Sequence, residues 1–357
     1  MNCFRVYSLA AVVAVLATGG CNGTSGSGGL ERSIPAVTMA NAKHRIHKNL
    51  DSSDITEYTI PTNNSFPIGI TTGPDGALWF AEHKAARLGR ITISGNITEF
   101  ANLSGKAHCP LFAVTGADGN IWVTADNDPS NKALENKHDN RASLGSVLRV
   151  TPQGAVTEYP LPTQFSDPRQ IVKGPDGTVW LGESVGTVGT MTTSGALTEY
   201  NTPDGSRPFG LGVGPDGALW FGESVNDELG RITVSGAISL YAFPKNSGPT
   251  GVVAGPDGNL WVTEFFANKV AKVSTSGVIL SEYPTSAYPR SIVAGSDGNL
   301  YFTEYGAGKI GQLTVGGVLT EIATPTPNSA PFSLTAGPDG NVWFTESATG
   351  KIGKLSL

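Results

Sequence analysis

The segment Gly255-Pro256-Asp257-Gly258-Asn259-Leu260-Trp261 joins a tight turn to the start of an apolar strand. Proline fixes φ early in such a turn, and glycine takes the positive φ that a tight hairpin requires. The Asp-Gly turn recurs roughly every 40 residues, a period typical of repeat proteins. The recurring pairs begin at Asp75, Asp118, Asp176, Asp216, Asp257, Asp297 and Asp339, with an insertion after Asp118. A further pair, at Asp204, falls off the period in a connection between two units.

Each unit contains the same four short segments. In the first unit they are residues 68–70 before the turn, 78–82 after it, 88–92, and 97–100 after a Ser-Gly turn. The second segment, Leu78-Trp79-Phe80-Ala81-Glu82, is almost entirely apolar, which fits a strand covered on both faces by neighbouring sheets. Four short antiparallel strands, repeated seven times, predict an all-β fold, a seven-bladed β-propeller over residues 54–357.

The aromatic residues and the chain ends fit the same architecture. The tryptophans all occupy one position of the second segment, where they pack one blade against the next, and Tyr301 takes the seventh place. They are Trp79, Trp122, Trp180, Trp220, Trp261 and Trp343. The last unit ends with its third strand at residues 351–357, whereas Ile55-Thr56-Glu57-Tyr58 precedes the first unit and matches Leu197-Thr198-Glu199-Tyr200. We therefore expect the N-terminal strand to complete the last blade and remove its open edge.

The N-terminal residues indicate export. Arg5 is followed by an apolar run and then by small residues up to Cys21, so residues 1–21 resemble a bacterial lipoprotein signal in which Cys21 is lipidated. Plain secretion and a retained anchor are the alternatives. Residues 22–53 open with Gly and Ser and are predicted to be a flexible linker. We expect a periplasmic or cell-surface protein that contacts the membrane only through the lipid, and in which Cys109 has no disulfide partner after processing.

Composition limits the partners. Charged residues make up only 15% of the chain, against about 25% in typical domains, so long solvated helices are not expected. The formal net charge of −6 argues against a nucleic-acid partner, since that role needs a basic face. We expect a monomer with no nucleic-acid partner.

The repeats resemble the streptogramin lyase (virginiamycin B lyase) family. The similarity lies in the turn and strand of residues 255–261, in Lys309-Ile310-Gly311 and in Thr198-Glu199-Tyr200, and it extends over residues 54–357. It implies a propeller, and an activity in which cyclic streptogramin B antibiotics are linearised by magnesium-assisted elimination at an ester.

The same resemblance places the family's working histidines directly after a proline in the last two blades. The matching positions here are Arg290, after Pro289, and Phe332, after Pro331, so both histidines are absent. A family carboxylate before the second proline corresponds to Ala330, and another, at the end of a second strand, is matched by Glu346.

A glutamate also ends the second strand in most other units. These residues are Glu82, Glu183, Glu223, Glu264, Glu304 and Glu346, with Ala125 as the exception. Because the residue repeats, we expect it to serve the blade by accepting hydrogen bonds, with metal binding as the alternative.

Residues that follow the leading proline of each first strand are predicted to surround the mouth of the central channel. They are Ile68, Arg169, Phe209, Thr250, Arg290 and Phe332, with Leu111 or Phe112 in the second unit. We single out Arg169, Phe209, Arg290 and Phe332 as ligand-binding candidates. A guanidinium offers a planar fork of donors to a carboxylate, sulfate or phosphate. The alternative for both arginines is pairing with the strand-end glutamates.

Two further features are candidates for catalysis or metal binding. His83 follows Glu82, so that pair is a weak candidate for a base or metal site, as is Glu346 for catalysis; an exposed loop histidine is the alternative. The insertion, residues 126–146, contains His138 and several Asp and Asn residues with oxygen ligands of the type that calcium prefers, in no recognised calcium-loop spacing. A flap over the mouth or surface decoration are its two interpretations.

Three functions follow. The first is a noncatalytic exported propeller that binds a small molecule, peptide or glycan at the channel mouth and requires no cofactor. The second is a lyase, with Mg²⁺, using a rebuilt site around Glu346, His83 and the arginines, or a related hydrolase. The third is an envelope scaffold that contacts another protein. The sequence contains no identifiable Ser-His-Asp order, cysteine nucleophile with a placed base, metal-binding Cys cluster or phosphate-binding Gly loop.

Overall fold

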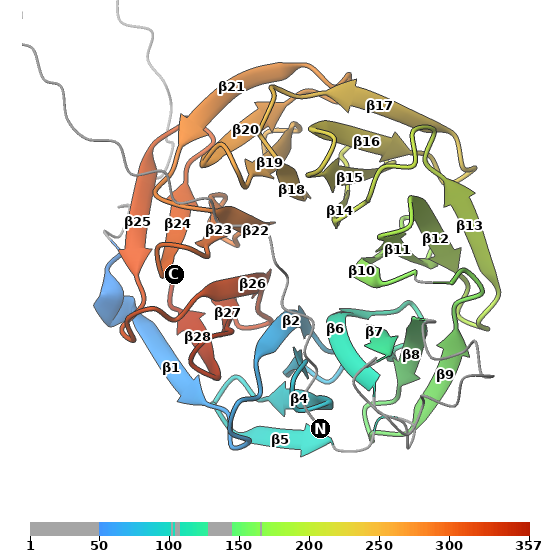
Figure 1. Ribbon diagram of the computed structural model, residues 1–357. Coiled ribbons are helices and arrows are strands. Elements are labelled where there is room, and N and C mark those ends of the chain that lie inside the picture. The colour runs from blue at the N-terminus through green and yellow to red at the C-terminus, as the bar shows by residue number, and fades with distance from the viewer. Residues whose placement is uncertain (1–49, 101–102, 104–107, 128–144, 165) are drawn as a thin grey trace, which may run out of the picture. The chain divides into compact units, whose positions relative to one another are not determined.

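Seven four-stranded antiparallel sheets surround a central axis (Figure 1). The structure is a computed structural model that describes residues 50–100, 103, 108–127, 145–164 and 166–357. The predicted signal, the lipidation site Cys21, nearly all of the predicted linker and residues 128–144 of the insertion lie outside these residues. In the described part of the chain, no helix has the length and hydrophobicity that crossing a membrane requires.

The chain runs through the sheets in order, each strand pairing with the next. The first sheet contains β2 (Pro67–Thr72), β3 (Leu78–Glu82), β4 (Arg87–Ile91) and β5 (Ile97–Phe100). The second contains β6 (His108–Thr115), β7 (Ile121–Asn127), β8 (Ser146–Val150) and β9 (Val156–Pro160). The third contains β10 (Pro168–Lys173), β11 (Val179–Glu183), β12 (Thr187–Met191) and β13 (Leu197–Asn201). The fourth sheet contains β14 (Gly210–Val213), β15 (Leu219–Glu223), β16 (Glu228–Ile232) and β17 (Ile238–Ala242). The fifth contains β18 (Pro249–Ala254), β19 (Leu260–Glu264), β20 (Lys269–Val273) and β21 (Ile279–Pro284). The sixth contains β22 (Pro289–Ala294), β23 (Leu300–Glu304), β24 (Lys309–Leu313) and β25 (Leu319–Ala323).

The last sheet combines the two ends of the described chain, which confirms the predicted closure. It contains β26 (Pro331–Ala336), β27 (Val342–Glu346), β28 (Lys351–Leu355) and β1 (Ile55–Thr59), which follows the short 3-10 helix η1 (Ser52–Asp54). Strand β1 pairs antiparallel with β28, with Tyr58 opposite Ile352. The Glu57 carboxylate accepts hydrogen bonds from Lys351 Nζ at 2.6 Å and from the Thr326 backbone N–H at 2.8 Å. The N-terminal strand therefore covers the edge of β28 and completes the four-stranded sheet.

The repeated tryptophans fill the spaces between neighbouring sheets, as predicted. Trp343, for example, is fully buried and packs with Leu78 and Phe80 of the next sheet. In six sheets the indole Nε1–H donates to the turn aspartate four residues earlier, over 3.0–3.4 Å. In the seventh, the Tyr301 hydroxyl donates to Asp297 at 2.9 Å. The aspartate of each turn thus orients the aromatic ring that joins two blades.

A bulge follows the leading proline of most first strands. Between Pro289 and Ile292 the register with β23 shifts, so β22 carries one extra residue there. Equivalent shifts occur in β2, β6, β10, β18 and β26. The residues at the bulge, among them Arg290, are thereby presented at the central axis.

Candidate functional site

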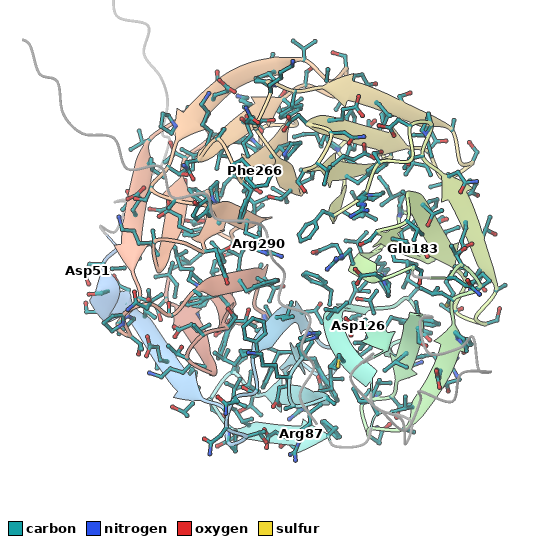
Figure 2. All side chains as sticks on the ribbon, in the orientation of Figure 1. Asp51, Arg87, Asp126, Glu183, Phe266 and Arg290 are labelled. Atoms are coloured by element: carbon teal, nitrogen blue, oxygen red, sulfur yellow. The ribbon has the colours of Figure 1, made fainter. Side chains whose placement is uncertain are left out.

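A pocket opens where the first strands of several sheets meet near the axis. It encloses about 370 Å³, counted with its open mouth. We call it the mouth pocket; its lining residues are Phe112, Gln170, Phe209, Gly210, Leu211, Thr250, Gly251, Val252, Arg290, Ser291, Ile292 and Phe332. Figure 2 shows Arg290 beside the central opening of the ring. The sequence had brought Phe209, Thr250, Arg290 and Phe332 together as mouth residues, and the structure does so.

The guanidinium of Arg290 lies among aromatic rings. Its central carbon is 3.8 Å from the centroid of the Phe332 ring and 4.9 Å from that of Phe209. Tyr305 packs edge-on against Phe332, with centroids 6.0 Å apart, and Phe112 lies 6.2 Å from Phe332 on another side. Arg290 is only 8% exposed, so the stacking is largely shielded from water and correspondingly favourable. The rings hold this cation at a fixed place in the pocket lining.

Arg169 has a different role. Its Nη2 pairs with Asp167 at 2.6 Å, and its Nε donates to Ser184 Oγ at 2.8 Å. Its guanidinium carbon lies 5.6 Å from the Phe209 ring, yet Arg169 is not among the lining residues of the mouth pocket. This ion pair joins Arg169 to an aspartate of a loop, whereas the sequence suggested pairing with a strand-end glutamate.

The structure adds residues that the sequence did not single out. Gln170 lines the mouth pocket, and Tyr305 supports the Phe332 ring from the β23–β24 connection. Gln170 follows Arg169 directly and could have been found from the bulge, which presents two successive residues after the proline. Tyr305 follows a strand-end glutamate, and no spacing rule connects it to the first strand of the next sheet.

His83 is buried, and the expectation of an exposed loop histidine was wrong. It is 2% exposed, and its Nδ1 lies 3.3 Å from the Pro110 carbonyl oxygen on the adjacent sheet. Burial lowers the pKa of His83 to about 4. The charges that act on the neighbouring Glu82 come from Glu99 and Arg87, so the two side chains face different surroundings and form no described Glu-His pair.

Potential ligand atoms of His83, Cys109 and Asp126 lie within 4.8 Å of one another. Cys109, however, is disulfide-bonded, so its sulfur is not a thiolate ligand. This bond does not test the expectation that Cys109 has no disulfide partner after processing. The other two cysteines of the chain, Cys3 and Cys21, both lie outside the described residues, in the segment assumed to be cleaved or lipidated. The expectation applied to a processed chain, whereas the structure is of the whole chain.

The strand-end glutamates are all fully buried. In five sheets the partner is a second glutamate on the fourth strand; the pairs are Glu82–Glu99, Glu183–Glu199, Glu264–Glu282, Glu304–Glu321 and Glu346–Glu57. Burial first, and then the second carboxylate, raises the pKa of Glu183 to about 8. The expected role as hydrogen-bond acceptor holds for Glu304, which accepts from the Ser286 N–H, and for Glu346, which accepts from Thr349. The other buried glutamates are carboxyl pairs rather than acceptors of backbone groups.

Glu346 does not line the mouth pocket. It accepts from Thr349 Oγ1 at 2.9 Å and lies beside Glu57 and Lys351 at the seam between β27, β28 and β1. Burial raises its pKa to about 7, with Glu57 adding to the shift and Lys351 opposing it. The structure therefore does not gather Glu346, His83 and Arg290 around one cavity.

Comparison with known proteins identifies the family. A model of the "Virginiamycin B lyase family" matches residues 36–133 and 245–357. The chain belongs to the virginiamycin B lyase family. Curated virginiamycin B lyases match over shorter segments: that of Nocardia farcinica is 32% identical over 138 residues, and that of Bacillus licheniformis 46% over 43 residues. These segments span 39% and 12% of this chain, and 42% and 15% of the two relatives.

Solved structures of virginiamycin B lyases extend the similarity to the whole propeller. A streptogramin B lyase structure is 34% identical, has a TM-score of 0.74, and is matched over 84% of this chain and 96% of its own. A catalytically inactive histidine-to-alanine variant of virginiamycin B lyase from Staphylococcus aureus, with quinupristin, is 33% identical, with a TM-score of 0.74 and coverage of 85% and 99%.

The mouth pocket does not offer the donor set of a magnesium site. Mg²⁺ is usually held by one or two carboxylates together with water or substrate oxygens. The described lining contains no carboxylate and places the Arg290 cation there instead. Glu346, the position matched to a family carboxylate, is fully buried beside Lys351. The residues present do not fit Mg²⁺ at this mouth.

Proposed function

We propose that this member of the virginiamycin B lyase family is a binding propeller. Its mouth pocket takes a small aromatic or planar group with an anionic substituent, presented by a small molecule, peptide or glycan. The observation that carries the proposal is the Arg290 guanidinium, which lies in the pocket lining between the Phe332 and Phe209 rings. Phenyl rings favour a planar apolar group, and the guanidinium favours a carboxylate, sulfate or phosphate.

The size of the pocket supports a small bound group. Its 370 Å³ includes the open solvent at the mouth, so the enclosed part is smaller still. A bulky macrocycle would have to rest above the opening, with only one of its substituents inside. Gln170 and Thr250 in the lining supply polar atoms for orientation.

The proposal is for binding without catalysis. The two positions that the resemblance matches to family histidines are Arg290 and Phe332. An arginine stays protonated in proteins and a phenyl ring has no titratable group, so neither removes an α-proton at neutral pH. His83 is buried against Pro110, and Glu346 lies at the outer seam of its sheet.

Binding is tested with a panel of aryl carboxylates, aryl sulfates and uncharged analogues, measured by isothermal titration calorimetry. We expect anionic aryl compounds to bind saturably, and Phe332→Ala and Arg290→Gln each to weaken binding by about tenfold or more. Phe266→Ala is the matched control, because Phe266 is an aromatic residue that is 41% exposed and does not line the pocket. Equal weakening by the control, or binding that ignores the anionic group, would refute the proposed site.

A lyase is the second candidate, because the likeness to lyase structures spans 96–99% of their length. In that case, incubation with quinupristin and Mg²⁺ would yield a linear isomer of unchanged mass, since elimination opens the ring ester without adding water. If the protein converts quinupristin and the Glu346→Gln variant does not, the protein is a lyase and the proposal of binding without catalysis is wrong. An envelope scaffold predicts instead that crosslinking in intact cells captures one defined envelope protein.

We further propose that the protein is exported, anchored through a lipid on Cys21, and monomeric. The support is the apolar run that ends in small residues before Cys21. Metabolic labelling with a palmitate analogue tests the anchor: a Cys21→Ser variant is expected to lose the label. Unlabelled wild-type protein in the culture medium would favour plain secretion.

A further inference from the structure

One sheet carries an acid at the start of its third strand, where four other sheets carry a base and the remaining two carry Ser146 and Thr187. In β4, β20, β24 and β28 the first residue is basic: Arg87, Lys269, Lys309 and Lys351. Each pairs with the fourth-strand glutamate that faces the buried strand-end glutamate. In β16 the first residue is Glu228, and the fourth-strand position is Leu240. This sheet therefore has an acid where others have a base.

A third carboxylate joins the two from this sheet. Asp204, from the off-period Asp-Gly turn between β13 and β14, lies close to Glu223 and Glu228, and one oxygen of each residue is within 4.8 Å of the others. Asp204 is fixed in place, since its Oδ1 accepts from the Ser206 N–H at 3.0 Å and its Oδ2 from Asn226 Nδ2 at 2.6 Å. Three oxygen ligands thus converge from two strands and a loop.

Among the described residues, no lysine or arginine pairs with these three carboxylates. Glu223 is fully buried, and neither of its oxygens accepts a hydrogen bond from a described residue. The groups that lie closest to Glu223 in the cluster, Asp204 and Glu228, are also acids. Buried carboxylates without a cation are unfavourable, so this site favours a bound cation.

We propose that Asp204, Glu223 and Glu228 bind a calcium ion. All three ligands are carboxylate oxygens, which Ca²⁺ prefers and which suit it better than zinc. The three carboxylate oxygens lie within 4.8 Å of one another, which is close enough for one ion to contact all three. A flexible set of carboxylates with water suits Ca²⁺ better than Mg²⁺, which demands near-ideal octahedral geometry. Asp204 is exposed, so water completes the coordination from the solvent side. The site is separate from the mouth pocket and independent of its ligand.

The test uses the full chain with CaCl₂ alone. About 5 mM Ca²⁺ is expected to raise the melting temperature by several degrees over an EDTA-treated sample, and Mg²⁺ to raise it less. Calorimetry should show saturable Ca²⁺ binding that Asp204→Asn and Glu228→Gln each weaken by about tenfold or more. Glu228→Lys, which introduces a base at the start of β16, should abolish binding. A base occupies this position in four other sheets, so the lysine variant is expected to fold.

Glu183→Gln is the matched control. Glu183 is an equally buried strand-end glutamate, but its sheet supplies Thr187 and a single opposing carboxylate, Glu199. Its substitution should leave the calcium-induced shift unchanged. A shift that persists in Glu228→Lys, or an equal shift with Mg²⁺, would overturn the proposal, because the ion would then act elsewhere or nonspecifically.

Discussion

The Thr263 hydroxyl donates a hydrogen bond of 2.7 Å to the Arg290 carbonyl oxygen of the next sheet. The Thr263 hydroxyl oxygen in turn accepts from the Gly251 N–H at 2.8 Å, so one buried hydroxyl joins the first strands of two blades. Thr124, Thr303 and Thr345 make the equivalent bond to Arg169, Phe332 and Ile68. A threonine on a second strand therefore fixes the backbone of the mouth residue in the following blade.

Replacing Thr263 with valine tests this link. The variant keeps the side-chain shape but leaves the Arg290 carbonyl and the Gly251 N–H without their partner, and it should lower the free energy of unfolding by about 1–3 kcal/mol. It should also weaken ligand binding in the mouth pocket. Thr345→Val is the control: it should cost similar stability, measured by urea unfolding, without affecting binding, because Ile68 does not line the pocket. Equal effects of both variants on binding would contradict local positioning.

Asp257→Asn should destabilise the protein at neutral pH by about 1–2 kcal/mol. Burial opposes ionisation, but hydrogen bonds from Lys272 and Trp261 outweigh it and hold the pKa of Asp257 at about 2. The carboxylate therefore contributes stability above the unfolded-state pKa near 4, and this contribution is lost as pH falls toward 2. Thermal unfolding should show a difference between variant and wild type at pH 7 that disappears near pH 2. A constant difference would point to a loss of packing instead.

Glu183→Gln should have the opposite pH dependence. The folded protein keeps Glu183 protonated up to about pH 8, whereas the unfolded chain releases that proton near its ordinary pKa of 4.5. Wild-type stability is therefore fully present below pH 4.5 and falls as pH rises toward 8. Relative to wild type, the amide variant should gain on the order of 1–3 kcal/mol between pH 5 and pH 8.5. A relative stability that does not change with pH would rule out the buried protonated carboxyl.

Removing β1 should open the ring. A chain that begins at Ile60 loses the strand paired with β28, together with the Glu57 contacts to Lys351 and Thr326. We expect a large drop in melting temperature and concentration-dependent association through the exposed β28 edge, measured by light scattering. A chain that begins at Leu50 keeps β1 and serves as the control. Comparable behaviour of the two chains would show that closure contributes little.

The blade count, the interblade tryptophans and the closure by β1 follow from the sequence, because each depends on a local pattern that repeats. The hydrogen bond from Trp261 to Asp257 could be predicted from the sequence, since a tryptophan follows the turn aspartate by four residues in six units. Pairing of Glu82 with Glu99 was harder to foresee, because it requires the register of nonadjacent strands.

The site was predictable only in part. The position after the proline placed Arg290 and Phe332 at the mouth, but no pattern shows that one would stack on the other at 3.8 Å. The buried environment of His83 depends on Pro110 of the next sheet, which sequence spacing does not reveal. The acidic cluster could be detected in the sequence at Glu228, because the equivalent position in four other sheets is a lysine or an arginine.

Strand β1 also bears on how the molecule is made. Glu57 and Lys351, which meet at the closing seam, are 294 positions apart in the chain. During synthesis the first strand emerges early, yet its partner leaves the ribosome only with the final residues. Six blades can form as they emerge, while the seventh waits for the whole polypeptide. Nascent chains and fragments truncated at the C-terminus should therefore be good substrates for chaperones and proteases until translation terminates.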